Sequence, residues 1–388
     1  MELNGYLKDI FEDYKIENLQ FSSRYLPYKD LNIFLESQLS GNFTKTTIGY
    51  SELGKPIYAL DFGKGNKKIL MWSQMHGNES TTTKAILDLI NFMSIYANTA
   101  YVRTIFEKCK IRIIPMLNPD GASSYTRFNA NEIDLNRDAL EKSQLETKSF
   151  FECFNSFEPD YCFNLHGQRT IFGAGASESS ATMSFLAPAY DEMLSINKPR
   201  EIAMKLIVSA NELLQDLIPN QIGRYDDAHN INCYGDYLQS HNVPTVLFEA
   251  GHYNNDYCRN KTRRFVCLSI LKMLFVIGND AIDKFDIKEY FKIPLNKKSF
   301  FDIIIKNVKN AKSNYIGIQY DEELIDGNIV FKPYIKSLDD LDSFYAHRLI
   351  DADNKFVYVN GLDFIEKNTV INSLKLGNEE LGLKLKNC

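Results

Sequence analysis

The stretch that decides the fold of this chain is KILMWSQMHGNES, residues 68–80. Its first half is a short apolar run, Lys68–Ser73, which predicts a buried strand, and residues 80–97 predict a helix. His76 and Glu79 stand between these two elements. In α/β sheets, ligands bind just beyond the carboxyl ends of the strands, so both side chains are candidates for a functional site.

Apolar runs and helical stretches alternate on both sides of this segment. Further strands are predicted at residues 111–116, 161–165 and 244–248, after a strand pair within 46–61. Helices are predicted at about 145–157, 200–217 and 257–276. The predicted strands are apolar on both faces, as in sheets that helices cover on both sides. We therefore expect an α/β fold with a mixed, mostly parallel sheet flanked by helices.

The two ends of the chain differ in texture from this central part. Residues 1–40 look helical and amphipathic, and we expect them to pack on a central domain at 41–288. After that point, short strand-like runs follow one another with few helix signals. Residues 289–388 therefore predict a small β-rich domain.

The composition is that of a globular protein. Of the 388 residues, 44% are hydrophobic and 24% are charged. The net charge of −6 disfavours nucleic-acid binding, which needs clustered cations. The most apolar run, residues 265–277, is interrupted by Lys272 and is too short to span a bilayer. We expect no nucleic-acid partner and no membrane contact, and the oligomeric state is left unknown.

The cysteines and the first residues bear on the compartment. The seven cysteines are odd in number and no two are separated by only two residues, which disfavours a disulfide framework and a four-cysteine zinc site. The N-terminus is rich in Asp and Glu and lacks the basic start and apolar stretch of a secretory signal. Together these features predict a cytoplasmic protein.

His166 is a third candidate ligand beside His76 and Glu79. It directly follows the predicted strand 161–165, so we expect it at the same edge of the sheet. Imidazole and carboxylate groups suit zinc, and three protein ligands leave a fourth position for water, as a catalytic zinc requires. Each residue alone has a plainer interpretation. His76 and Glu79 could be loop residues at a helix start, and His166 could be a buried structural histidine.

Three further segments carry groups that could act on a substrate. Asn118–Gly121 has the composition of a turn and is followed by Arg127. In Asp134–Asp138 a guanidinium stands beside an amide, which makes a fixed fork for a carboxylate, although a solvated ion-pair loop has the same composition. Glu249 ends the predicted strand 244–248 and could take a proton from a zinc-activated water. Its plainer interpretation is a solvated strand end.

Taken in order, these elements resemble the zinc carboxypeptidase family over roughly residues 45–280. The resemblance is carried by His76 with Glu79, the Asn118–Gly121 turn, Arg127, the Asp134–Arg137 segment, His166 and Glu249. The spacing of nine from Arg127 to Asn136 is similar to that in the regulatory-type branch of the family, whose members carry a small β domain after the catalytic one.

This resemblance implies a metallocarboxypeptidase with one zinc ion per chain, which cleaves a C-terminal peptide bond by metal-activated water. The substrate would be a peptide or peptide-like molecule with a free carboxylate. The implied roles are zinc ligation by His76, Glu79 and His166, proton transfer by Glu249, polarisation of the scissile carbonyl by Arg127, and binding of the terminal carboxylate by Asn136 and Arg137.

Two features of the family have no clear counterpart in the sequence. For the mobile tyrosine over the terminal-residue pocket, Tyr225 is the best candidate, with Arg224 or Tyr234 as alternatives. Asp236 could select a basic terminal residue from the pocket floor, although a Gly-Asp turn explains it equally.

Two other functions are compatible with the same motifs. Acylases of the aspartoacylase and succinylglutamate desuccinylase type, which hydrolyse N-acyl amino acids, resemble this chain at the same residues. A catalytically inactive binding module is the second alternative. Dead relatives usually lack a ligand or the base, and here His76, Glu79, His166 and Glu249 are all present. Cell-wall peptides are permitted as substrates equally with other peptides.

Overall fold

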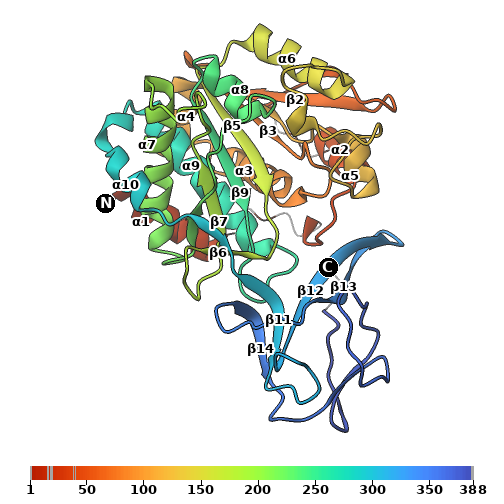
Figure 1. Cartoon of the computed structure of the whole chain (residues 1–388). Coiled ribbons are helices and arrows are strands. Elements are labelled where there is room, and N and C mark those ends of the chain that lie inside the picture. Colours follow the sequence, from red (N-terminus) through yellow and green to blue (C-terminus); the bar gives the residue numbers. More distant parts are fainter. Residues whose placement is uncertain (1, 15–16, 18–20, 38, 40, 386–388) are drawn as a thin grey trace.

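The computed structural model of the chain describes residues 2–14, 17, 21–37, 39 and 41–385. An eight-stranded sheet in the order β1-β2-β4-β3-β5-β9-β7-β8 forms the centre of the larger body (Figure 1). Its strands are β1 (Thr44–Tyr50), β2 (Pro56–Phe62), β3 (Lys67–Ser73), β4 (Cys109–Ile114), β5 (Tyr161–Gly167), β7 (Met183–Leu186), β8 (Ile222–Arg224) and β9 (Thr245–Ala250). The central strands β4, β3, β5 and β9 are mutually parallel, and antiparallel pairs occur at β1–β2, β2–β4 and β7–β9.

Helices cover both faces of this sheet. One face packs against α3 (Ser80–Ile95), α4 (Ala100–Lys108), α7 (Lys198–Gln215) and α9 (Asn260–Gly278), and the other against α6 (Leu145–Phe157) and α8 (Tyr234–Ser240). On β3, Ile69 and Met71 belong to the first hydrophobic cluster, whereas Leu70 and Trp72 belong to the second. Because alternate side chains of a strand point to opposite faces, a strand buried on both sides must be apolar throughout. The predicted α/β fold is confirmed.

Most predicted elements lie within a few residues of their expected positions, and α6 has the bounds 145–157 that the sequence indicates. The sequence does not predict α4, α8, β6 (Phe172–Ala174), β7 or β8. Three- or four-residue strands are too short to show a period. Helix α4 starts close behind α3 at Thr99, whose side chain caps it by accepting from the Val102 N–H.

The C-terminal part is rich in strands, as predicted. It contains a four-stranded sheet in the order β13-β12-β11-β14 and a three-stranded sheet in the order β15-β16-β17. Its strands are β11 (Phe300–Lys306), β12 (Tyr315–Ile325), β13 (Asn328–Ser337), β14 (Tyr345–Asp351), β15 (Val357–Val359), β16 (Leu374–Leu376) and β17 (Glu379–Glu380). Before them, β10 (Asn296–Lys298) pairs with β6 of the larger body. The division at 41–288 and 289–388 stays a prediction.

The N-terminal segment contains α1 (Glu2–Asp13) and α2 (Tyr28–Ser37), and parts of the predicted segment 1–40 lie outside the described residues. Buried side chains of both helices join the same cluster as α3 and α9. Arg263 of α9 connects this segment to the larger body. It forms a fully buried ion pair with Asp88 of α3 and donates to the Phe21 carbonyl.

Two features of the sequence that concern the compartment have structural counterparts. In the part of the chain that the structure describes, no helix is long and apolar enough to cross a membrane. Five of the described cysteines are free, whereas Cys258 is disulfide-bonded. A single disulfide is not a framework, but disulfides are rare in reducing compartments. It therefore does not favour the predicted cytoplasmic location.

Candidate active site

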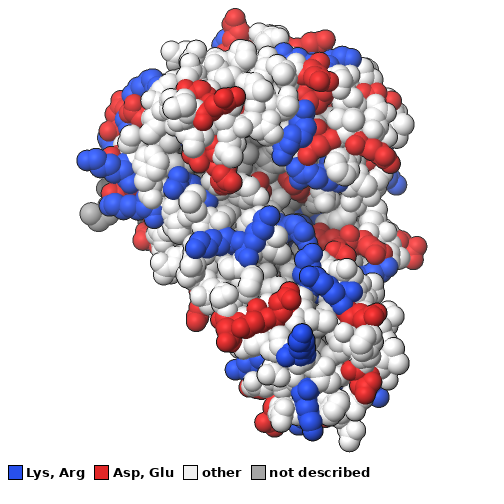
Figure 2. Space-filling model, viewed as in Figure 1, with Lys and Arg blue, Asp and Glu red and all other residues white. Residues whose placement is uncertain are grey.

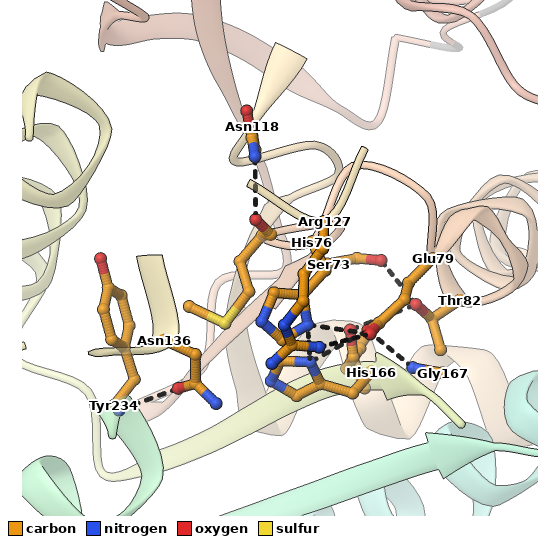
Figure 3. Close-up of polar contacts among 12 residues, drawn as sticks. Ser73, His76, Glu79, Thr82, Asn118, Arg127, Asn136, His166, Gly167 and Tyr234 are labelled. Atoms are coloured by element: carbon orange, nitrogen blue, oxygen red, sulfur yellow. Dashed lines mark hydrogen bonds and ion pairs between the residues drawn. The ribbon is translucent and has the colours of Figure 1, made fainter. Parts of the chain in front are cut away.

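Three ligand-type side chains meet at the carboxyl ends of β3 and β5 (Figure 3). His76 Nδ1 lies 2.8 Å from Glu79 Oε1, His166 Nδ1 lies 3.1 Å from Glu79 Oε2, and the two Nδ1 atoms are 3.1 Å apart. Among the described residues this is the only group of three or more His, Cys, Asp or Glu side chains with converging donor atoms. Donors that share a tetrahedral zinc ion at about 2.1 Å lie about 3.4 Å apart. The set fits zinc after a small outward shift.

The loop that carries His76 and Glu79 is fixed by the segment Asn118–Gly121. Asn118 Nδ2 donates to the Met75 carbonyl at 3.1 Å, and Asn118 Oδ1 accepts from the Gly121 N–H at 2.8 Å. A side chain at Gly77 would collide with the Gly121 backbone, since a Cβ there would lie 1.9 Å from the carbonyl carbon. The interpretation of Asn118–Gly121 as a turn is therefore incomplete. Asn118 caps α5 (Pro119–Ser124), and this cap supports the ligand loop.

Asp134 orients both His76 and Arg127, a role that the sequence did not indicate. Its Oδ1 lies 3.0 Å from His76 Nε2, and its Oδ2 accepts from Arg127 Nε and Nη2 at 3.1 and 3.0 Å. Burial opposes the charge of Asp134, but His76 and Arg127 hold the pKa of this carboxyl well below its usual range. A carboxylate on the second ring nitrogen fixes the tautomer of a metal-binding histidine and raises its basicity.

Glu249 stands next to His166 in the sheet. The register of β5 and β9 pairs His166 with Glu249, so the two side chains leave adjacent strands at the same level. Glu249 Oε2 is buried and has no hydrogen-bond partner among the described residues. Burial and the nearby Glu79 carboxylate raise the pKa of Glu249 well above its ordinary value, and Arg127 opposes this shift. A carboxyl group in this environment holds a proton more readily than an exposed one.

Asn136 and Arg137 occupy a different wall of the same cavity. Asn136 follows Asp134 in the short helix η2 (Leu135–Arg137), and its Oδ1 accepts from the Tyr234 N–H at 3.1 Å. Arg137 is exposed, and its Nη1 donates to the Asn136 carbonyl at 2.7 Å and to Cys233 Sγ at 3.1 Å. The predicted fork of guanidinium and amide is present at the surface of the cavity.

Of the three candidates for the mobile tyrosine position, Tyr225, Arg224 and Tyr234, only Tyr225 lines this cavity. It follows β8 and its ring packs on Phe172 at 5.4 Å. Burial raises the pKa of Tyr225, and the charges of Glu249 and Glu79 raise it further. Arg224 instead packs on Tyr290, and the buried Tyr234 packs in the cluster around Trp72.

Asp236 also lines the cavity. It is 7% exposed and accepts from the Ala189 N–H at 2.8 Å. Burial raises the pKa of Asp236 to about 7, although backbone N–H groups oppose the shift.

The whole cavity measures about 770 Å³. It contains every predicted site residue, namely His76, Glu79, Arg127, Asn136, Arg137, His166, Tyr225 and Glu249. The sequence missed Arg24 and the wall formed by β12 and β13, including Glu322 and Tyr334. Local patterns carry no signal for these residues, because they reach the cavity through packing between distant segments.

Comparisons with known proteins agree with this arrangement. A family model for zinc carboxypeptidase matches residues 34–211. Carboxypeptidase 2 of Trichophyton rubrum is 31% identical over 103 residues, which are 26% of this chain and 19% of that protein. Carboxypeptidase D of Mus musculus is 30% identical over 179 residues, which cover 39% of this chain and 13% of that protein. The chain thus spans about a fifth or less of the length of these two curated relatives.

Solved structures share the fold of the larger body. A metallo-carboxypeptidase from Burkholderia cenocepacia superposes with a TM-score of 0.54 at 16% identity, covering 66% of this chain and 71% of that chain. Bovine thrombin-activatable fibrinolysis inhibitor gives a TM-score of 0.54 at 15% identity, covering 68% of this chain and 99% of that chain. At such identities the likeness concerns the fold alone. The family model that matches residues 34–211 identifies this part of the chain as a domain of the zinc carboxypeptidase family.

Proposed function

We propose that the protein is a zinc-dependent metallocarboxypeptidase, which removes the C-terminal residue of a peptide or peptide-like substrate. The observation that carries this proposal is the pairing of His166 with Glu249 across β5 and β9, beside the cluster with His76 and Glu79. A carboxyl group beside three zinc-type ligands is the arrangement that hydrolysis of an amide needs, which supports the proposal. The family of the matched domain supports the same activity.

His76, Glu79 and His166 would hold the zinc ion. When bound, zinc supplies a Lewis acid and lowers the pKa of a coordinated water. Asp134 keeps the His76 ring in place by its contact with Nε2, so that Nδ1 stays directed at Glu79 and His166.

Glu249 would accept the proton of the attacking water and pass it to the leaving amine. Its Oε2 has no other described partner, so this oxygen is available to accept a proton and to return it. Arg127 would hold the oxyanion that develops on the scissile carbonyl. Its guanidinium is oriented by Asp134, and its Nη1 lies 3.6 Å from Glu79 Oε1, so it faces the ligand cluster.

Asn136 and Arg137 would bind the terminal carboxylate and Tyr225 would cover it. The fork matches a planar carboxylate, and Arg137 is free to turn because its described partners are a carbonyl and a thiol rather than a carboxylate. The alternative is hydrolysis of N-acyl amino acids. The extent of the cavity, which continues to β12 and β13, favours a longer peptide over a short acyl group.

The test compares peptides with a free and an amidated C-terminus, N-acyl amino acids and cell-wall peptides on zinc-loaded protein. We expect release of the last residue from free peptides only. Glu249→Gln should keep its zinc, measured by elemental analysis, and lose about 10²-fold or more in kcat. His166→Ala should lose the zinc. A protein that takes up no zinc, or a Glu249→Gln variant with full activity, would overturn the proposal.

A further inference from the structure

The cavity continues past the ligand cluster to the C-terminal β region. Tyr320, Asp321 and Glu322 of β12 and Phe331 and Tyr334 of β13 line its far wall. The proposed carboxylate fork lies on a different wall, where Asn136 Oδ1 accepts from the Tyr234 N–H at the start of α8 (Figure 3). Substrate residues upstream of the scissile bond therefore extend towards the β region, if the terminal residue sits at the fork.

Besides Arg24, which is paired with Glu322, two basic side chains stand on this upstream part of the cavity. Arg169 follows β5, Lys298 ends β10, and both are exposed lining residues. Neither has an ion-pair or hydrogen-bond partner among the described side chains and carbonyls. We call these two residues the basic patch. Figure 2 shows basic side chains gathered along the lower lip of the hollow between the larger body and the β region.

The residues on either side of Arg169 are held by contacts with the larger body and with the C-terminal β region. Gln168 Nε2 donates to the Ala181 carbonyl at 2.7 Å, and Asn296 Nδ2 donates to Gln168 Oε1 at 2.9 Å. On the other side, His347 Nε2 of β14 lies 2.8 Å from the Thr170 carbonyl. A charged group on such a fixed support loses less freedom on binding than one on a loose loop.

The backbone beneath Lys298 is part of the same support. Lys298 pairs with Phe172 in the β6–β10 ladder, three residues after Arg169. The two cations therefore belong to neighbouring segments that the ladder holds together.

Most anions near this part of the cavity are already paired. Glu322 accepts from Arg24 Nε at 3.0 Å and from the Tyr125 hydroxyl. Asp302 accepts from Tyr257, Gln319 and the Tyr320 N–H. Of the acidic groups on the β wall, Asp321 is left exposed. No ion pair joins Asp321 or another described carboxylate to Arg169 or Lys298, so the charge of the basic patch is available for a ligand.

We infer that the basic patch binds a carboxylate of the substrate upstream of the scissile bond, so that this protein prefers acidic peptides. The inference rests on the proposed function and deepens it. Arg169 follows His166 by three residues, so their Cα atoms are at most about 10 Å apart, which is about three residues of extended peptide. The acidic residue thus lies two or three positions before the scissile bond.

The test uses pairs of pentapeptides with a free C-terminus that differ only by Glu or Gln at the second or third position upstream. Two quantities are compared: kcat/KM on the zinc-loaded wild type, and affinity for the zinc-loaded Glu249→Gln variant by calorimetry. We expect a preference of about fivefold to tenfold for Glu at one of the two positions, as for one or two partly exposed ion pairs. The preference should shrink at 1 M salt, where charges are screened beyond about 3 Å.

The double variant Arg169→Gln/Lys298→Gln should lower the preference to below twofold. Lys297→Gln is the matched control, because Lys297 is an exposed neighbour on the same strand but does not line the cavity, and it should keep the preference. Equal affinity for both peptides, or a preference that survives in the double variant, overturns the inference. Tighter binding of the Glu peptide without any hydrolysis would sustain the basic patch and refute the peptidase activity. Hydrolysis of both peptides at equal rates would sustain the peptidase activity and refute the role of the basic patch.

Discussion

Replacing Asp134 by Asn tests whether the contact behind His76 matters as much as the ligands themselves. Asp134 serves two partners at once, with His76 Nε2 at 3.0 Å from Oδ1 and Arg127 on Oδ2. Asn has the same shape but only one acceptor oxygen. It must turn its NH₂ group towards His76 or towards Arg127, and it removes the negative charge from between them.

The size of the effect follows from these contacts. The Asp134 side chain is 16% exposed, so the contact with His76 is a partly buried, charge-assisted hydrogen bond of about 1.5–3 kcal/mol. If the zinc-bound state loses this hydrogen bond, the affinity for zinc falls by about 10–150-fold. This agrees with the tenfold to hundredfold that second-layer partners of zinc ligands usually contribute. We expect zinc affinity to fall by that factor, and kcat to fall further because Arg127 loses its orientation.

Zinc affinity is measured by competition with a fluorescent chelator at pH 7.5, and kcat is measured at saturating zinc so that the two effects separate. Arg127→Gln is the first comparison. It should lower kcat but keep zinc affinity within about threefold, since Arg127 is not a ligand. Asp9→Asn, an exposed position on α1, is the charge-matched control and should change neither quantity. An Asp134→Asn protein that binds zinc as tightly as the wild type would refute the assignment of Asp134 to His76.

Three further predictions concern other parts of the molecule. Arg137→Ala should lower kcat/KM for free-carboxylate peptides by about tenfold or more; an equal loss on amidated peptides would contradict the proposed fork. Asp236 has its pKa raised to about 7, so it is neutral below and charged above that pH. The ratio of kcat/KM for Lys-ended over norleucine-ended peptides should therefore rise several-fold from pH 6 to 8. Asp236→Asn should abolish that rise, and a flat ratio in the wild type would exclude Asp236 from the pocket floor. Asp88→Asn removes the closest carboxylate from the buried Arg263, which then keeps Glu17 Oε1 at 3.9 Å from Nη1, and it should destabilise the fold by about 3 kcal/mol in urea titrations; a shift below about 1 kcal/mol would contradict this.

The fold was predictable because its central strands are buried on both faces. A strand such as β3, with Leu70 and Trp72 on one side and Ile69 and Met71 on the other, must be apolar along its length, and that pattern is visible without a structure. The helices around it are long enough to show their period. Short elements such as β6 have no such pattern, and β14 pairs in parallel with β11 across more than thirty residues.

The residues of the candidate site also differ in whether a local sequence pattern predicts them. His76, Glu79, His166 and Glu249 each follow an apolar strand, and parallel strands bring their carboxyl ends to one edge of the sheet. Their order in the sequence was therefore enough to expect them together. Tyr225 could be separated from Arg224 and Tyr234 only by the direction in which each side chain leaves the chain, which depends on the packing around β8.

The sequence alone thus determined the fold class of the larger body, the three ligand-type residues and the carboxyl group beside them. Tertiary structure decided the rest: the support of His76 by Asp134, the pairing of Arg24 with Glu322 over 298 residues, and the basic patch of Arg169 and Lys298 on the cavity. The physical reason is the range of the interactions. Strand and helix periods are set by neighbouring residues, whereas the contact of two distant side chains depends on how whole elements pack, and no local pattern in the chain records that packing.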